Sequence, residues 1–412
     1  MGWDALWTNV KLATMAEAGY GAIRDGAIAV ADGRIAWIGQ RGDLPAPLAR
    51  TVRVLHDAGG LWLTPGLIDS HTHIVFAGNR AMDFEMRLNG ADRAAIYAAG
   101  GGIPSTVLKT RAASFETLLA EALPRIDSLQ AEGVTTVEIK SGYGLDMETE
   151  LRQLRVARRI GETRPLSVVT SFLGTHGMPP GWAGTQDSYI DFVCAESLPE
   201  AVRQGLVDIV DGGLEKLAFD HAQMRRVWDV AQRLGKPIKA HTDQYSDAGG
   251  GKVVAEVGGL SADHLECVSR PSVDAMARAG TVATVLPGAN YTLRDENKPP
   301  IGWFRELGVP MALSTNCNPG SSPTASPLLM MNMACTLFMM TPEEALAGFT
   351  RNAARALGLQ DSHGTLEVGK AADFALWRVG DLAELSYWLQ TGRLCAGIVK
   401  GGRSVPFQPA IR

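Results

Sequence analysis

The run Leu67-Ile68-Asp69-Ser70-His71-Thr72-His73 joins the end of an apolar strand to two histidines that one residue separates. Side chains at positions i and i+2 of a strand point to the same side, so both imidazoles can reach one ion. Imidazole is the commonest protein ligand for zinc and also suits iron. Taken alone, the pair is equally consistent with two polar residues that close a strand.

Two further histidines follow apolar segments much later in the chain. His241 ends the segment 236–240, and His264 ends the segment 260–263. A lone histidine after a strand is more often structural than a ligand. The placement of these four of the chain's eight histidines at strand ends nevertheless favours a metal site. Three protein ligands and a carboxylate would leave the open position that a catalytic metal needs for water.

The elements that must position these histidines alternate along the middle of the chain. Short apolar segments end in polar clusters, and segments with helical spacing, such as 115–132, follow them. About eight such strands indicate an α/β fold with a (β/α)₈ TIM-type barrel over residues 63–363. The expected strand ends are His71–His73, Lys140–Tyr143, Gly174–His176, Asp211–Glu215, His241–Gln244, Asp263–Glu266, Pro287–Asn290 and Asn316–Gly320. Active sites of such barrels lie at the C-terminal ends of the strands.

Both ends of the chain show short strands and turns instead. Asp32-Gly33 between the apolar runs 26–30 and 34–38 predicts a hairpin. Residues 372–377 and 396–400 have the pattern of strands. Because chain termini often lie close together, we expect residues 1–62 and 364–412 to form one small β-sandwich domain.

The composition is that of an ordinary globular protein, with 46% apolar and 20% charged residues. The net charge of -5 gives no support for a nucleic-acid partner. Five scattered cysteines without a CxxC pair favour reduced thiols and a cytoplasmic location. We expect no secretory signal and no membrane span. The longest apolar run, near 328–340, predicts a buried helix that would allow a homodimer.

These motifs together resemble the amidohydrolase superfamily and, within it, the imidazolonepropionases. The run 65–73 is shared across the superfamily, whereas the runs 75–80, 138–145 and 318–323 are more specific. The resemblance covers essentially the whole chain. It implies a barrel with a flanking β-sandwich and one divalent ion, Zn²⁺ or Fe. It also implies hydrolysis of the ring amide of 4-imidazolone-5-propanoate to N-formimino-L-glutamate in histidine degradation.

The resemblance also assigns roles by position. The implied metal ligands are His71, His73, His241 and Asn316. The implied substrate contacts are Arg80, Tyr143, His176, Gln244, Asn318, Gly320 and Ser321. His264, Gln244 and Asn316 would take part in catalysis. Arg80 is the expected partner of the substrate carboxylate because a guanidinium binds carboxylates bidentately. Glu215 is expected to orient its neighbours and not to bind metal.

The chain departs from the family pattern at the last barrel strand, where Asn316 stands in place of the usual Asp. An amide oxygen can coordinate a metal, but it carries no charge and cannot accept a proton. Three functions remain possible for the chain, and each involves a small molecule as substrate or ligand. The chain is either an active member of that family that relies on His264, with or without Gln244, or an inactivated homologue that binds metal or ligand without turnover, or another cyclic amidohydrolase or deaminase. The runs 75–80 and 138–145 count against the last.

Overall fold

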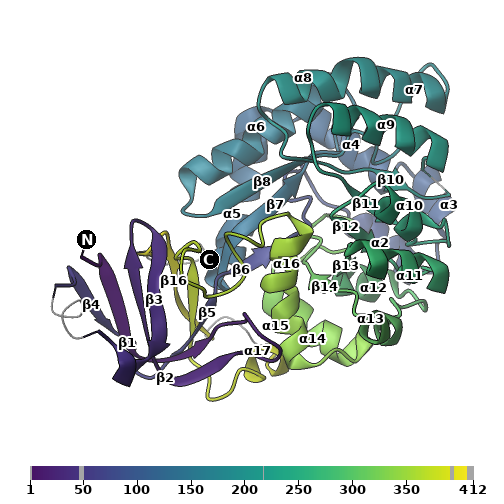
Figure 1. The fold of residues 1–412 in the computed structure, drawn as a ribbon. Coiled ribbons are helices and arrows are strands. Elements are labelled where there is room, and N and C mark those ends of the chain that lie inside the picture. Colours follow the sequence, from purple (N-terminus) through teal and green to yellow (C-terminus); the bar gives the residue numbers. More distant parts are fainter. Residues whose placement is uncertain (1, 46–50, 217, 390–393, 406–412) are drawn as a thin grey trace.

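The computed structural model describes residues 2–45, 51–216, 218–389 and 394–405. Figure 1 shows a unit of strands beside a larger unit in which helices surround parallel strands. The predicted fold class, a barrel with an added β domain, is therefore confirmed. The exact boundaries of the two domains stay a prediction.

The barrel strands follow one another in chain order and pair in parallel. The strands are β6 Leu67–Asp69, β7 Val134–Lys140, β8 Ser167–Phe172, β9 Ile209–Val210 with β10 Gly213–Leu214, β11 Lys239–Thr242, β12 Ser261–His264, β13 Val282–Val285 and β14 Met311–Leu313. A bridge between Val210 and Ile238 connects the two parts of the sheet. The ring closes just beyond β6 and β14, where the amide of Asn316 donates to the carbonyl of His71 at 3.0 Å.

Helices cover the outside of these strands, so β7 is buried at all seven positions. The α-helices of the described residues are α2 Ala81–Leu88, α3 Arg93–Ala98, α4 Gly102–Ala112, α5 Phe115–Ala131, α6 Met147–Thr163, α7 Gln186–Phe192, α8 Leu198–Arg203, α9 His221–Arg233, α10 Gly250–Glu256, α11 Arg270–Ala279, α12 Pro287–Leu293, α13 Ile301–Leu307, α14 Pro327–Phe338, α15 Pro342–Gly348, α16 Arg351–Ala356 and α17 Glu384–Tyr387. The predicted helix at 115–132 is confirmed as α5. Its Pro124 lies on the exposed side, where water can satisfy the carbonyl that loses its partner.

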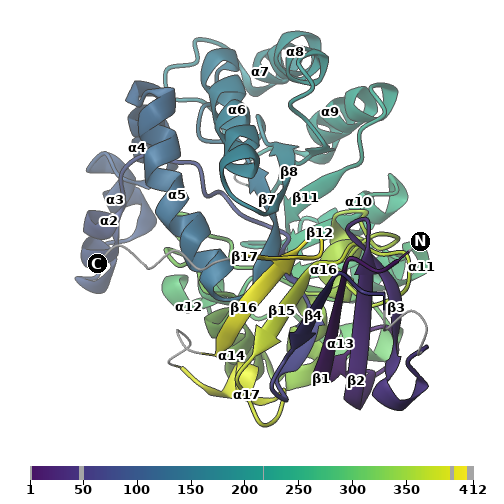
Figure 2. The ribbon, with the colours of Figure 1, turned by 90° about the vertical axis from the view of Figure 1, so that its left-hand side faces the viewer.

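Strands from both ends of the chain form the second unit, and Figure 2 shows them side by side. They are β1 Ala5–Ala13, β2 Ala22–Ala31, β3 Arg34–Gln40, β4 Val54–Asp57, β5 Trp62–Pro65, β15 Phe374–Trp377, β16 Cys395–Lys400 and β17 Arg403–Val405. The predicted hairpin is confirmed, since Asp32 and Gly33 both have positive φ between β2 and β3. These strands form one continuous sheet that branches at β1, which pairs with both β4 and β5.

The chain passes from this sheet into the barrel at Gly66, between β5 and β6. A Cβ atom at this position would lie 2.1 Å from the Oγ1 atom of Thr135 on β7. Only glycine therefore lets the first barrel strand begin this close to its neighbour.

Three features outside the barrel strands agree with the sequence. The helix predicted near 328–340 is α14, and most of its apolar side chains are buried. His56 stacks on Trp7 with 4.5 Å between ring centroids, which gives it a structural role in the β domain. No helix in the described ranges is long and apolar enough to cross a membrane. The predicted homodimer stays a prediction.

Candidate metal and substrate site

A cavity of about 570 Å³ opens at the C-terminal ends of the barrel strands. Its lining contains most of the predicted site residues: His73, Arg80, Tyr143, His176, Gln244, His241, His264, Asn316, Asn318, Gly320 and Ser321. His71 lies directly beneath this lining and is fully buried. Residues that are up to 250 positions apart in the chain thus converge, as a barrel of this class requires.

The histidines from β6, β11 and β12 meet at the floor of the cavity. The Nε2 atoms of His73 and His241 are 3.2 Å apart, and the ring of His71 lies 4.5 Å from that of His241. Two overlapping groups of three imidazoles have ligand atoms within 4.8 Å of one another. One group is His71, His241 and His264, and the other is His73, His176 and His241. His176, expected only as a substrate contact, therefore lies among the candidate ligands as well.

Buried carboxylates fix the orientation of two of these rings. The Nδ1 atom of His71 lies 2.6 Å from Asp263 Oδ2, and that of His241 lies 3.0 Å from Asp211 Oδ1. The Nε2 atom of His71 is buried and has no hydrogen-bond partner among the described residues. A carboxylate on Nδ1 holds the proton there and leaves the Nε2 lone pair for a metal.

The same carboxylates are neutralised by two lysines inside the barrel. Lys140 Nζ donates to Asp211 at 2.6 Å and to Glu138 at 2.7 Å, and all three side chains are fully buried. Lys239 Nζ lies 3.3 Å from Asp263 and donates to the carbonyl of Ser70 at 2.6 Å. Burial opposes the charge on Lys140, but the carboxylates of Asp211 and Glu138 raise its pKa above the usual value. Lys140 is therefore charged.

Three of these imidazoles, those of His71, His73 and His241, are neutral, which is the form that binds a metal. Burial lowers the pKa of both His71 and His73 well below the usual value, and neighbouring positive charge adds to the effect. Burial also lowers the pKa of His241, although the carboxylate of Asp211 opposes this shift. The donor set, the free Nε2 atom and the neutral rings fit a metal ion bound by nitrogen ligands.

Asn316 follows β14 and reaches the cavity beside these histidines. The main-chain amide of Asn316 donates to the carbonyl of His71, and the backbone of Asn316 adopts a left-handed φ of 49°. The side-chain oxygen accepts a hydrogen bond of 3.1 Å from the side-chain amide of Asn318. A neutral side chain therefore occupies the position where the family pattern has a carboxylate.

His264 ends β12 and completes the floor. Its ring lies 5.8 Å from that of His71 and 5.5 Å from that of His241, measured between centroids. Its Nδ1 atom is buried and has no hydrogen-bond partner among the described residues, and a carboxylate oxygen of Glu266 lies 3.7 Å from it. His264 therefore lines the cavity beside the other histidines.

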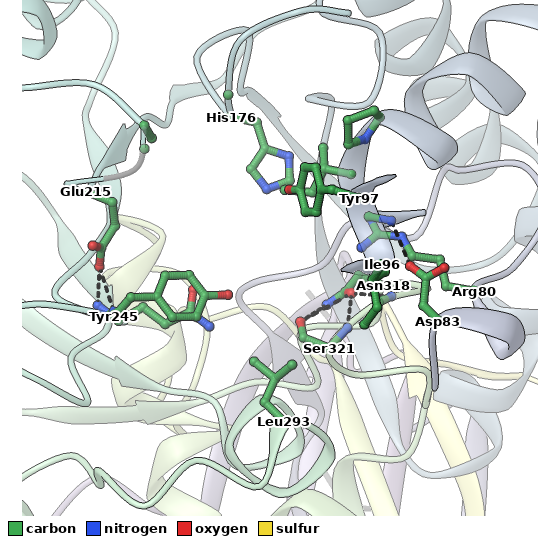
Figure 3. Close-up of a pocket in the computed structure, with 18 of the residues that line it drawn as sticks. Arg80, Asp83, Ile96, Tyr97, His176, Glu215, Tyr245, Leu293, Asn318 and Ser321 are labelled. Atoms are coloured by element: carbon green, nitrogen blue, oxygen red, sulfur yellow. Dashed lines mark hydrogen bonds between the residues drawn. The ribbon is translucent and has the colours of Figure 1, made fainter. Parts of the chain in front are cut away.

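The opposite side of the cavity carries the guanidinium of Arg80 and further hydrogen-bond donors. Arg80 is held by a 2.7 Å hydrogen bond from its Nε atom to Thr106, and its guanidinium lies against Gly320. Figure 3 shows Arg80, Asn318 and Ser321 on this side. Asn318 Oδ1 accepts the main-chain amides of Gly320 and Ser321, each at 2.8 Å, which fixes the loop that follows β14.

Tyr143 and His176 stand between the two sides. Burial raises the pKa of the Tyr143 hydroxyl to about 12, so it remains a donor. Burial lowers the pKa of His176 to about 3, and its Nδ1 atom donates to the carbonyl of Gly142 at 3.0 Å. The Nε2 atom of His176 therefore lacks a proton and can accept or ligate.

Glu215 has the orienting contacts that the sequence predicted. Its carboxylate accepts the main-chain amides of Gln244 and Tyr245 and the hydroxyl of Ser246. Figure 3 shows it directed at this loop, across the cavity from Arg80. Glu215 belongs to neither group of candidate metal ligands.

Two sets of residues in and around the site had no assigned role from the sequence. One is the network of Lys140, Lys239, Asp211 and Asp263. Charged residues within or directly after apolar strands were the feature of the sequence that could have indicated this network. The other is the segment of α2 to α4, which adds Asp83, Arg87 and Tyr97 to the cavity lining. No local pattern indicated that this segment folds over the strand ends.

Comparisons with known proteins agree with this architecture. Residues 91–405 match the model of the amidohydrolase family. The chain is 60% identical to the imidazolonepropionase of Ralstonia nicotianae over 97% of this chain and 98% of that protein. It is 54% identical to the imidazolonepropionase of Cupriavidus necator over 97% and 95% of the two chains.

Solved structures show the same fold at low sequence identity. An adenosine deaminase of Xanthomonas campestris with bound zinc superposes with a TM-score of 0.72 and 18% identity, covering 98% and 93% of the two chains. Atrazine chlorohydrolase of Arthrobacter aurescens with zinc gives a TM-score of 0.69 and 18% identity, covering 97% and 94%. These likenesses support the fold alone.

Proposed function

The chain belongs to the imidazolonepropionase family of the amidohydrolases, and we propose from this that it hydrolyses the ring amide of 4-imidazolone-5-propanoate in histidine degradation. The product is N-formimino-L-glutamate. The observation that supports the proposal is one cavity that joins a cluster of histidines to the guanidinium of Arg80. That combination matches a substrate with a cyclic amide at one end and a carboxylate at the other.

We assign the metal ligands as His71, His73, His241 and the amide oxygen of Asn316. One divalent ion, Zn²⁺ or Fe, would fit this donor set. Such an ion, when bound, lowers the pKa of water and polarises a carbonyl.

The remaining residues position the substrate and move protons. Arg80 pairs with the propanoate carboxylate, while Tyr143 donates a hydrogen bond and Gln244 holds the ring. Water adds to the ring carbonyl carbon, and His264 accepts the proton that this oxygen loses. The ring C–N bond then breaks, the nitrogen takes up a proton, and the former carbonyl becomes a carboxylate.

The expected rate of hydrolysis depends on Asn316, which stands where the family has a carboxylate. The loss of a catalytic proton acceptor commonly costs a factor of about 10² to 10⁴. We therefore expect slow turnover that depends on His264 and a large gain in kcat for Asn316→Asp.

The test is steady-state hydrolysis of 4-imidazolone-5-propanoate by both forms, with metal content measured in the same samples. Full activity of the unmodified chain, with no gain for the Asp form, would remove position 316 from the proposed chemistry. No hydrolysis by either metal-loaded form would refute the proposed function and favour a binding homologue.

A further inference from the structure

A second guanidinium lies on the same side of the cavity as Arg80. Arg80 is the N-cap residue of α2, and Asp83 and Arg87 follow it three and seven positions later. Positions i, i+3 and i+7 share one face of a helix, and all three residues line the cavity. The rise of the helix separates the two arginines by about 10 Å along its axis.

Arg87 has an incompletely satisfied charge. Its Nη1 atom is buried, and no acceptor within the described ranges forms a hydrogen bond with it. Asp83 lies one helical turn before Arg87, but its Oδ2 atom accepts the main-chain amide of Gly102 at 2.8 Å. A buried donor without an acceptor is costly, so it indicates a place for a bound ion, water or ligand.

The proposed reaction supplies a ligand with the complementary charge. The substrate carries one carboxylate, for which Arg80 is sufficient. Cleavage of the ring amide by water creates a second carboxylate, so the product carries two. Two arginines on one helix face therefore match the product better than the substrate.

We propose that Arg80 and Arg87 form a two-point subsite for dicarboxylates through which the product leaves. This inference rests on the proposed function. The original carboxylate moves from Arg80 to Arg87, and the newly formed carboxylate takes its place at Arg80. Arg87 thus acts on product release and makes no contact that the substrate needs.

The direct test measures by calorimetry the affinity of the metal-loaded protein for two probes whose carbon chains are equally long. Glutarate carries two carboxylates, and pentanoate carries one. We expect glutarate to bind about tenfold more tightly than pentanoate, the size expected for a charge-assisted hydrogen bond. Arg87→Gln should abolish this preference without changing the affinity for pentanoate, and Arg87→Lys should retain most of it.

A matched control separates contact from general electrostatics. Lys109 on α4 is a cation whose Nζ atom donates to the carbonyl of Asn79 next to Arg80, and it is outside the cavity lining. Lys109→Gln removes the same charge as Arg87→Gln but should keep the preference for glutarate. Equal affinity of the unmodified protein for both probes, or an intact preference in Arg87→Gln, would overturn the inference.

A failure of the proposed function would give results that differ from a failure of the Arg87 subsite. Arg80→Gln should weaken the binding of both probes, and unchanged binding of pentanoate would remove Arg80 as the carboxylate anchor. Kinetics give an independent readout for Arg87. Arg87→Gln should raise the inhibition constant of N-formimino-L-glutamate about tenfold, and Lys109→Gln should leave it unchanged. A rise in KM alone would contradict a role in release.

Discussion

The two sides of the cavity are built in opposite ways. The histidine wall, formed by His71, His73, His241 and His264, stands on strand ends and is almost completely buried. The arginine wall, formed by Arg80, Arg87, Asn318 and Gly320, stands on the start and body of α2 and on a loop. Behind the histidine wall, Asp211 and Asp263 are paired with lysines, whereas in the arginine wall the buried Nη1 atom of Arg87 has no acceptor among the described residues.

This difference agrees with the tasks that we propose for the two sides. Groups that hold a metal and move protons must keep one geometry, and packed strands provide it. Groups that admit a charged ligand must leave their charge available until the ligand arrives. Variants in the histidine wall should therefore affect stability and metal binding, and those in the arginine wall should affect ligand binding alone.

The largest effect is expected from Lys140→Met. The change leaves Glu138 and Asp211 buried without their shared cation, so the free energy of unfolding should fall by about 3–5 kcal/mol. Denaturant unfolding measures this loss. The exposed pair of Arg159 and Glu162 is the control, and Arg159→Met should cost less than about 1 kcal/mol. Similar losses in both variants would contradict the special role of the buried pairs.

Asp263→Asn tests whether the carboxylates behind the histidines serve metal binding. The asparagine can still accept from His71 Nδ1 but no longer strengthens its basicity, so metal affinity should fall by about 10–100-fold. Competition with a chelator measures this affinity. Asp208→Asn, which breaks a half-buried pair with Arg158 away from the cavity, should leave the affinity unchanged. A purely structural role of Asp263 predicts equal affinities in both variants.

Gly320→Ala perturbs the arginine wall without changing its charge. A Cβ atom at this position would lie 2.3 Å from Arg80 Nη1, so the guanidinium must move. We expect KM to rise about tenfold, equivalent to about 1.4 kcal/mol, with little change in kcat or melting temperature. Gly177 lines the same cavity, and a Cβ there would meet nothing within 4 Å. Gly177→Ala should therefore behave like the unmodified protein.

The smallest effect is expected from Tyr143→Phe. The variant loses one hydrogen-bond donor, which should raise KM about fivefold, the equivalent of about 1 kcal/mol. Because burial raises the pKa of this hydroxyl to about 12, the pH profile of kcat should keep its shape at lower pH. Steady-state rates across the pH range test both statements. A changed profile would instead assign Tyr143 a role in proton transfer.

Local patterns predicted the histidine wall well. The period of two in His71-Thr72-His73 and the positions of His241 and His264 after apolar segments both reflect strand geometry, which is a local property. Patterns could not assign the lysines that neutralise Asp211 and Asp263, because Lys140 and Lys239 find those partners on other strands. The arginine wall was predicted only in part, since Arg87 gains its role from the packing of α2 against the barrel mouth.

The sequence by itself determined the alternation of strands and helices, the hairpin at Asp32-Gly33 and the residue types at the strand ends, because each depends on neighbours a few positions apart. The tertiary structure decided which distant residues meet. His71 and Asp263 are 192 positions apart, yet their atoms lie 2.6 Å from each other. Closure of the barrel brings such groups together, and burial then makes their pairing obligatory, because a charge far from water needs a partner.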